Sequence, residues 1–215
     1  MSVSYQTYVF DPACINSEQR KNLEAYLCIL REWNRAINLV SHASLEKAWE
    51  RHILDSASLL PLLPAHTRIL VDLGSGAGFP ALVLKILRPA IHVHLVESDQ
   101  KKVGFLRHLS QTLRYDVHIH PQRIETVPPF PCDVLTARAL SHFDTLMDLS
   151  SPWFAYNPHL IGLFHKGQKI EAEIAQHTKK QKSKHTHPLI LEIHTPNSLK
   201  NAHIVKVERG TESED

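Results

Sequence analysis

The 215-residue sequence predicts a doubly wound α/β fold, in which helices cover both faces of a mostly parallel sheet. Two observations carry this prediction. Extended apolar runs alternate with helical patterns from residue 66 to residue 208, and the first run ends in three glycines on alternate positions. With 43% hydrophobic residues, a chain of this length is expected to form a single domain around one sizeable core.

The segment before this core is expected to be a helical extension. Residues 1–15 show no clear period and predict an irregular lead-in, and the extension itself covers residues 15–62. Asn16 can cap the first helix, because Gln19 lies three residues later and apolar residues then recur on one helical face. A second helical stretch is predicted from Ser44 to Leu60, ending before a proline.

The first strand of the core ends in Asp72, and Gly74, Gly76 and Gly78 follow just before a helical pattern. Glycine allows positive φ angles and the close approach of a ligand to the backbone. A dinucleotide-binding loop would need glycine at position 79, which is Phe79, and no P-loop lysine follows. The spacing is instead typical of Rossmann-like class I methyltransferases, whose cofactor is S-adenosylmethionine. Asp72, Gly74 and Gly76 are therefore candidate cofactor-binding residues; the alternative is a turn without a ligand.

The second strand provides an independent indication of a ribose-containing ligand. It covers residues 91–96 and ends in Glu97, about 20 residues after the glycines, where such folds place an acid against ribose hydroxyls. The alternative is that Glu97 is a solvated acid at the start of the helix predicted over residues 99–113, where it would favour the helix dipole.

The remaining pattern completes the sheet. Strands are predicted over residues 116–120, 132–137 and 160–164, with helices over 143–154 and 169–178. Residues 189–194 and 203–207 flank a Pro-Asn-Ser turn and predict a C-terminal antiparallel hairpin, followed by a loose polar tail over residues 208–215.

Composition narrows the function classes. No apolar run has transmembrane length and no signal architecture is present, so we expect a soluble, cytoplasmic protein without membrane contact. The three cysteines are scattered, which fits a reducing compartment. Despite 16 histidines, the chain has no C-x-x-C or H-E-x-x-H motif, and no metal site is predicted. A net charge of +2 does not by itself indicate a nucleic-acid partner.

Six motifs occur in order along residues 15–208. They are Trp33-Asn34-x-x-Ile37-Asn38-Leu39, Arg51-His52-Ile53-Leu54-Asp55-Ser56, Asp72-Leu73-Gly74-Ser75-Gly76-Ala77-Gly78-Phe79-Pro80, Glu97-Ser98-x-x-Lys101-Lys102-x-x-Phe105-Leu106, Ala137-Arg138-Ala139 and Lys166-Gly167. With these motifs the sequence resembles the RsmG family, also called GidB, the bacterial 16S ribosomal RNA guanine-N7 methyltransferases that act in the 530 loop of the small subunit. The resemblance implies S-adenosylmethionine as cofactor and 16S rRNA as partner. Two alternatives stay open, a same-fold methyltransferase acting on a protein or small molecule, and a catalytically silent rRNA-binding assembly factor.

The resemblance also implies particular cofactor contacts, which fall here on Gly74, Phe79, the main chain of Ile124 and Glu125, and Arg138. From the residues alone, Ile124 and Glu125 could equally be a loop anchor and a solvated acid. Guanine N7 carries a lone pair and no proton, so methyl transfer needs placement and no general base.

Arg138 is the predicted catalytic residue. Its planar fork suits a methionine carboxylate, a phosphate or guanine O6, and the sequence does not choose among them. The alternative is a structural ion pair with Asp133 or Asp144. His52 and Asp55 lie three residues apart on a helical face and could orient each other, although capping or packing is the favoured interpretation.

RNA contacts are expected from dispersed basic residues. The candidates are Arg31, Arg35, Lys101, Lys102, Arg107 and the run from Lys179 to Lys184. We expect a monomer, because no long apolar stripe is left unassigned. Whether the substrate is naked RNA, a subunit or an assembly intermediate is left open.

Overall fold

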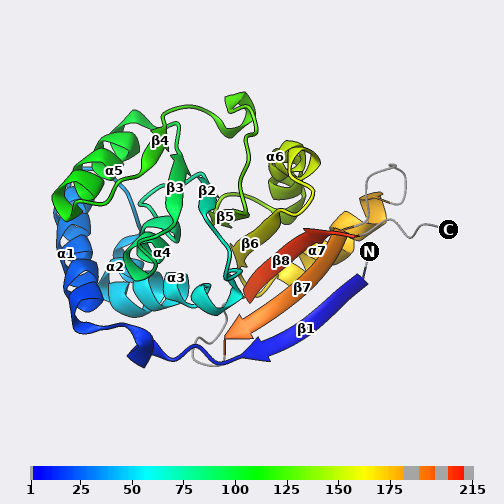
Figure 1. Cartoon of the computed structure of the whole chain (residues 1–215), viewed down its shortest axis with the longest axis horizontal. Helices are drawn as coiled ribbons and strands as arrows, with labels where there is room; N and C mark the ends of the chain where they lie inside the picture. Colours follow the sequence, from blue (N-terminus) through cyan, green and yellow to red (C-terminus); the bar gives the residue numbers. More distant parts are fainter. Residues whose placement is uncertain (1, 182–188, 197–202, 211–215) are drawn as a thin grey trace.

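The computed structural model describes residues 2–181, 189–196 and 203–210, which form helices packed on both faces of a central sheet (Figure 1). The strands of this sheet are β1 (Ser2–Tyr8), β2 (Ile69–Leu73), β3 (His92–Val96), β4 (His118–His120), β5 (Val134–Arg138), β6 (Ile161–Lys166), β7 (Leu189–Pro196) and β8 (His203–Arg209). Their order across the sheet is β1-β7-β8-β6-β5-β2-β3-β4. This confirms the predicted doubly wound α/β architecture.

Among the described strands, only β8 runs antiparallel to both of its neighbours. β2, β3, β4, β5 and β6 pair in parallel, whereas β8 is antiparallel to both β6 and β7. The predicted C-terminal antiparallel pair is therefore confirmed, although the residues of the predicted turn between its strands, 197–202, lie outside the described part of the chain. The strand order reverses between β2 and β5, and in open α/β sheets ligands bind at such a switch point, beyond the carboxyl ends of the strands.

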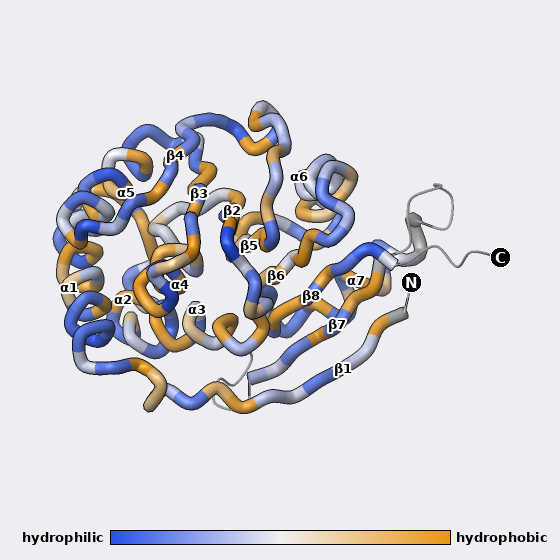
Figure 2. Tube along the Cα trace, in the orientation of Figure 1, coloured by the Kyte–Doolittle hydropathy of each residue, from blue (hydrophilic) through white to orange (hydrophobic). Residues whose placement is uncertain are grey.

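Helices cover the sheet in two groups. The α-helices are α1 (Ser17–Asn34), α2 (His42–Glu46), α3 (Asp55–Ala57), α4 (Ala81–Leu87), α5 (Gln100–Leu113), α6 (Phe143–Tyr156) and α7 (Ile170–Gln181). One core cluster joins α1, α4 and α5 to one face of the sheet, and a second joins α6 and α7 to the other face. Along α4 every residue is buried, and Figure 2 colours most of this helix as hydrophobic.

The first long helix begins as its sequence predicts. The Asn16 side chain accepts a hydrogen bond from the Gln19 amide at 2.9 Å, and the Gln19 side chain accepts one from the Asn16 amide at 3.0 Å. This reciprocal capping box satisfies two N–H groups that the first turn leaves unpaired. Tyr26, from the buried face of α1, reaches the glycine loop and donates to the Ala77 carbonyl at 2.5 Å.

The expected irregular lead-in is wrong in its first half. Ser2–Tyr8 forms β1, which pairs in parallel with β7 at one edge of the sheet, so that the blue and orange strands lie side by side in Figure 1. Two large side chains of β1 are exposed to solvent, Val3 at 37% and Tyr5 at 63%. Val3, Tyr5 and Thr7 alternate with Ser2, Ser4 and Gln6, and this period of two is the strand signal that the expected lead-in overlooked.

The second helical stretch is also not continuous. It consists of α2, a π-helical segment at Trp49–Leu54, the short α3 and a 3₁₀ turn at Leu60–Leu62. Lys47 breaks the run with non-helical angles of φ −111° and ψ 39°. The π-helical segment carries Arg51 and His52, and such segments are frequent at functional sites.

The C-terminal basic run is only partly described. Lys179 and Lys180 belong to α7, but their side chains, like Lys182 and Lys184 altogether, lie outside the described part. The expected loose tail begins later than predicted, because β8 continues to Arg209; residues 211–215 are again outside the description.

Candidate active site

A pocket of about 580 Å³ lies at the carboxyl ends of β2, β3 and β5, at the point where the strand order reverses. The glycine loop forms its floor, and the other sides come from the segments after α1, β3, β4 and β5 and from the π-helical segment. The residues that line it are Leu39, Val40, Ser41, Ser44, Arg51, His52, Gly74, Ser75, Gly76, Ala77, Phe79, Val96, Glu97, Ser98, Lys102, Gln122, Arg123, Ile124, Glu125, Arg138, Ala139, Leu140 and Leu149.

The glycine loop has the left-handed backbone that only glycine adopts without strain. Gly74, Gly76 and Gly78 have φ angles of 68°, 56° and 87°. A Cβ atom on Gly74 would come within 2.5 Å of the Leu140 side chain, so this glycine lets the loop after β5 approach. A Cβ on Gly76 would meet only the Gly74 carbonyl, at 3.9 Å. The loop therefore leaves open space for a ligand at Gly76.

Glu97 is anchored at the edge of this loop. Glu97 is only 8% exposed. Its Oε2 accepts a hydrogen bond from the Gly76 amide, and its Oε1 accepts one from the Asp99 amide, each at 2.8 Å. The alternative of a solvated helix-start acid applies to Asp99, the N-cap of α5, rather than to Glu97. Each carboxylate oxygen keeps a further lone pair, so both can still accept from a pair of hydroxyl groups.

Arg138, at the end of β5, is held by the π-helical segment. Its Nη2 donates to the Arg51 carbonyl at 2.7 Å and to His52 Nδ1 at 2.8 Å, and its Nε lies 3.5 Å from Asp55 Oδ2. Nη1 is buried and has no hydrogen-bond partner among the described residues. The partner of Arg138 is thus Asp55.

The alternative ion pairs with Asp133 and Asp144 are wrong. Asp133 instead accepts from the Arg68 and Ile69 amides, at 2.7 and 2.8 Å, and Asp144 lies 2.7 Å from His177.

His52 connects the arginine to the aromatic floor of the pocket. Its ring stacks on Phe79 with 4.8 Å between centroids, and Tyr26 also stacks on Phe79 at 5.0 Å. Burial, together with the charge of Arg138, lowers the pKa of His52 to about 4. The neutral ring accepts from Arg138 at Nδ1, so its Nε2–H donates to Ser44, 3.2 Å away.

Ile124 and Glu125 lie on a 3₁₀ turn, Ile124–Thr126, after β4, and both line the pocket. Ile124 is half-buried and Glu125 is exposed. Seven of the eight predicted cofactor-binding residues therefore meet around one cavity. Asp72 is the eighth and lies beneath the loop, fully buried and not among the lining residues.

Two features of the pocket were missed from the sequence. Leu39 and Val40 come from the segment after α1, and their amides both donate to the Asn34 side chain at 2.9 Å. The motif at residues 33–39 was the available signal for this wall. The second feature is the contact of His52 and Asp55 with Arg138. The spacing of His52 and Asp55 in the sequence does not identify Arg138 as their partner.

Burial raises the pKa of Asp72 to about 7, although the hydrogen bond donated by Thr136 at 2.6 Å opposes the shift. In the unfolded chain this carboxyl ionises near 3.8, so the folded state keeps a proton that the unfolded state releases between these values. The contribution of protonated Asp72 to the free energy of unfolding is therefore fully present below about pH 4 and is lost as the pH rises to about 7.

We expect Asp72→Asn to remove this loss. Relative to wild type, its free energy of unfolding should rise between pH 4.5 and pH 8 by up to about 3 kcal/mol, the upper bound that a folded-state pKa of about 7 sets over this interval. Urea denaturation at both pH values measures the difference, with Asp148→Asn on the exposed side of α6 as control. A difference that does not change with pH would show that Asp72 is ionised in both states.

Within the described residues, no three or more His, Cys, Asp or Glu side chains form a group that could hold a metal ion. In the same part of the chain, no helix combines the length and apolar character needed to cross a bilayer.

Comparison with known proteins gives consistent matches. The family model described as rRNA small subunit methyltransferase G, GidB, matches residues 19–204. The ribosomal RNA small subunit methyltransferase G of Rhodospirillum rubrum is 44% identical over 162 residues, which cover 75% of this chain and 79% of that protein.

Solved structures share the fold at low sequence identity. The mitomycin 7-O-methyltransferase MmcR has a TM-score of 0.58 at 15% identity, covering 91% of this chain and 69% of that one. A mutant of MtNAS in complex with S-adenosylmethionine has a TM-score of 0.56 at 12% identity, with 90% and 77% covered.

Proposed function

Because the chain belongs to the rRNA small subunit methyltransferase G (GidB) family, we propose that it transfers a methyl group from S-adenosylmethionine to N7 of a guanine in the 530 loop of 16S rRNA. The observation that supports this most is the meeting of the glycine loop, Glu97 and Arg138 around one pocket at the switch point of the sheet.

The residues of the pocket fit this cofactor. Gly76 leaves open space above the loop, Glu97 has lone pairs free for the two ribose hydroxyls, and Arg138 has one buried nitrogen without a partner. We propose that Gly74 and Phe79 also contact the cofactor and that the main chain of Ile124 and Glu125 borders its adenine. Asp72 would act indirectly, by supporting the loop from below. The bound cofactor supplies an electrophilic methyl group on a sulfonium.

The transfer needs little acid–base chemistry from the protein. The N7 lone pair forms the new N–C bond, while the electron pair of the C–S bond stays on sulfur, so the positive charge moves from sulfonium to guanine. No proton is displaced at N7. The chain's contribution is to orient the two reactants and exclude water, which in favourable cases lowers barriers by several kcal/mol.

We propose that a rim of cations binds the RNA backbone. Arg51 and Arg123 are exposed, Lys102 is half-buried, and all three line the pocket although they come from separate segments. Of the basic residues nominated from the sequence, Arg107 borders a different hollow at the far end of α5. Proximity to the pocket therefore favours Lys102 over Arg107 as an RNA contact.

We expect the charge reversal Lys102→Glu to raise KM for small subunits and to weaken the dependence of binding on salt, since each phosphate contact releases counterions. The matched control is Arg107→Glu, the same change of charge sign on the same helix, which should stay close to wild type. Methylation kinetics at several salt concentrations measure both. Equal effects of the two variants would indicate a diffuse basic surface and would argue against the rim.

The decisive test of the proposed function is mapping of the product. The protein is incubated with labelled S-adenosylmethionine and small subunits that lack the modification, and the rRNA is analysed by mass spectrometry. Label at N7 of a 530-loop guanine is the expected result. Label at another nucleotide, or on a protein, would refute the assignment of the site, and cofactor binding without any transfer would refute this substrate.

A further inference from the structure

The segment after β5, residues 139–142, forms a wall of the pocket through Ala139 and Leu140, and it has an unusual backbone conformation. Ala139 has a φ angle of 51°, a left-handed conformation that is rare outside glycine. Ala139 and Leu140 face the pocket, yet together with Ser141 they also border a separate hollow of about 100 Å³ on the side of β6. Side-chain packing on that side is therefore incomplete, and other contacts must hold the wall.

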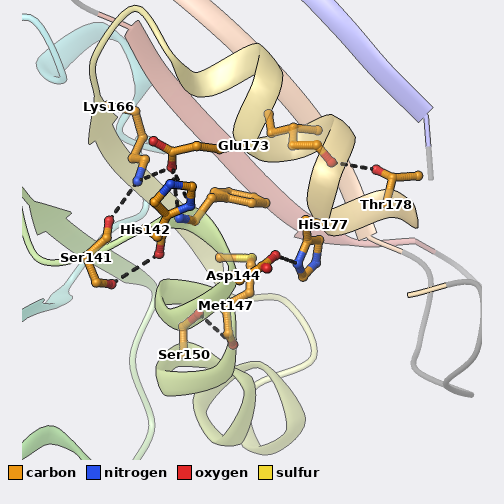
Figure 3. Close-up of polar contacts among 11 residues, drawn as sticks. Ser141, His142, Asp144, Met147, Ser150, Lys166, Glu173, His177 and Thr178 are labelled. Carbon is orange, nitrogen blue, oxygen red and sulfur yellow. Dashed lines mark hydrogen bonds and ion pairs between the residues drawn. The ribbon is translucent and has the colours of Figure 1, made fainter. Parts of the chain in front are cut away.

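Those contacts converge on one ion pair, drawn in Figure 3. Lys166, at the end of β6, donates to the Ser141 carbonyl at 2.8 Å and lies 2.7 Å from Glu173 Oε2. The same Glu173 oxygen, reaching over from α7, accepts from the Phe143 amide at 2.9 Å. The His142 ring is 3.8 Å from it.

Glu173 thereby replaces a missing cap. His142 is the N-cap of α6 but makes no capping hydrogen bond through its side chain, and the carboxylate of Glu173 satisfies the first N–H group of that helix instead. The side chains of Lys166 and Glu173 are 9% and 15% exposed, so the pair is largely shielded from solvent. Burial would raise the pKa of Glu173, but the hydrogen bonds from Lys166 and Phe143 outweigh it and lower the pKa.

We propose that Glu173 is a positioning residue for methyl transfer, which acts through Lys166 and the α6 N-terminus to fix the wall at residues 139–142 against which the target base is placed. The inference rests on the proposed function for the identity of the base. The wall also touches the cofactor loop, because Leu140 occupies the space that a side chain on Gly74 would need. A displacement of the wall would thus misplace the acceptor relative to the methyl donor.

The test uses the full-length protein and the isosteric variant Glu173→Gln, which keeps the shape of the side chain but removes its charge. We expect kcat on small subunits to fall by roughly 100-fold, the cost of a small misplacement of reacting groups. The dissociation constant for S-adenosylmethionine should change less than about threefold, since no cofactor contact is removed. Hydrogen exchange of peptides covering residues 139–143 should become faster in the variant without any ligand.

Two controls separate positioning from general loosening of α6 and α7. Glu171→Gln changes an exposed carboxylate on the same helix and should match wild type in all three measurements. Asp144→Asn weakens another contact between these helices, that of Asp144 with His177 at 2.7 Å, which does not involve Lys166 or Glu173 (Figure 3). If Asp144→Asn lowers kcat as much as Glu173→Gln, the effect is one of helix packing and the proposal is wrong.

A second variant, Lys166→Gln, keeps the test decisive if Glu173→Gln does not fold. It removes the ammonium that joins Ser141 to Glu173 and should give the same faster exchange and lower kcat. Unchanged exchange in the folded variants would overturn the inference whatever the activity shows. The kcat values of variant and wild type are compared on whichever nucleotide the wild type methylates. If that nucleotide is not a 530-loop guanine, the proposed function is refuted, but this comparison stays valid.

Discussion

Replacing Arg138 with methionine is expected to lower the rate of rRNA methylation by at least about 100-fold, the usual cost of removing one preorganised donor from an active site. Its guanidinium is oriented by the Arg51 carbonyl, His52 and Asp55, and one nitrogen remains free for a ligand. Single-turnover assays on small subunits measure the effect. Parallel titration with S-adenosylmethionine identifies the ligand, because weaker binding indicates the methionine carboxylate, whereas unchanged binding indicates a group on the RNA.

The controls for this substitution address stability and geometry. Arg138→Met leaves Asp55 without its partner, so the double variant with Asp55→Asn is compared as well, since it removes the uncompensated charge. Arg88→Met tests the loss of an arginine that binds the Pro64 and Ala65 carbonyls outside the pocket, and it should retain catalysis. Arg138→Lys should not restore activity, because an ammonium cannot reproduce the planar fork. Near-normal methylation by folded Arg138→Met would eliminate the catalytic role.

Replacing Glu97 with glutamine should raise the dissociation constant for S-adenosylmethionine roughly 10- to 100-fold, the range expected when a charged hydrogen-bonding partner is lost. Both carboxylate oxygens accept backbone N–H groups, from Gly76 and Asp99. An amide can accept at only one of its two ends, so its NH₂ group faces an N–H donor and disturbs the glycine loop. Isothermal titration calorimetry measures the affinity.

Glu125→Gln is the matched control for this variant. Glu125 also lines the pocket, but it is exposed, and the contact implied for it is through the main chain. Its substitution should therefore leave the affinity within about twofold of wild type, because exposed charges contribute little. If both variants bind the cofactor like wild type, Glu97 is a structural anchor of the loop and the ribose contact does not exist.

The parts of the site that the sequence predicts are those fixed by local spacing. The turn from the first core strand into the next helix needs left-handed backbone, and Gly74, Gly76 and Gly78 supply it. The position of Glu97 in the pocket is predicted by its distance along the chain from these glycines. The capping box at Asn16 is equally local.

The remaining features depend on contacts between distant segments. Asp55 meets Arg138 only because the π-helical segment packs over the end of β5, and no period in either segment encodes that meeting. The strand β1 was missed for a related reason. Its partners are the backbone groups of β7, near the other end of the chain, and the short alternation of Val3, Tyr5 and Thr7 does not identify that partner.

That pairing has a consequence for how the protein is made. The register that joins Ser2 to Ile190 closes a loop of nearly the whole chain, so β1 cannot pair until β7 has left the ribosome. Until then Val3 and Tyr5 lie on an unpaired segment. Without β1, the edge of the sheet would be β7, whose Leu191 and Ile193 are fully or almost fully buried in the complete structure. The N-terminal strand therefore covers β7 only from the last stage of synthesis onward, and it then occupies the edge of the sheet itself.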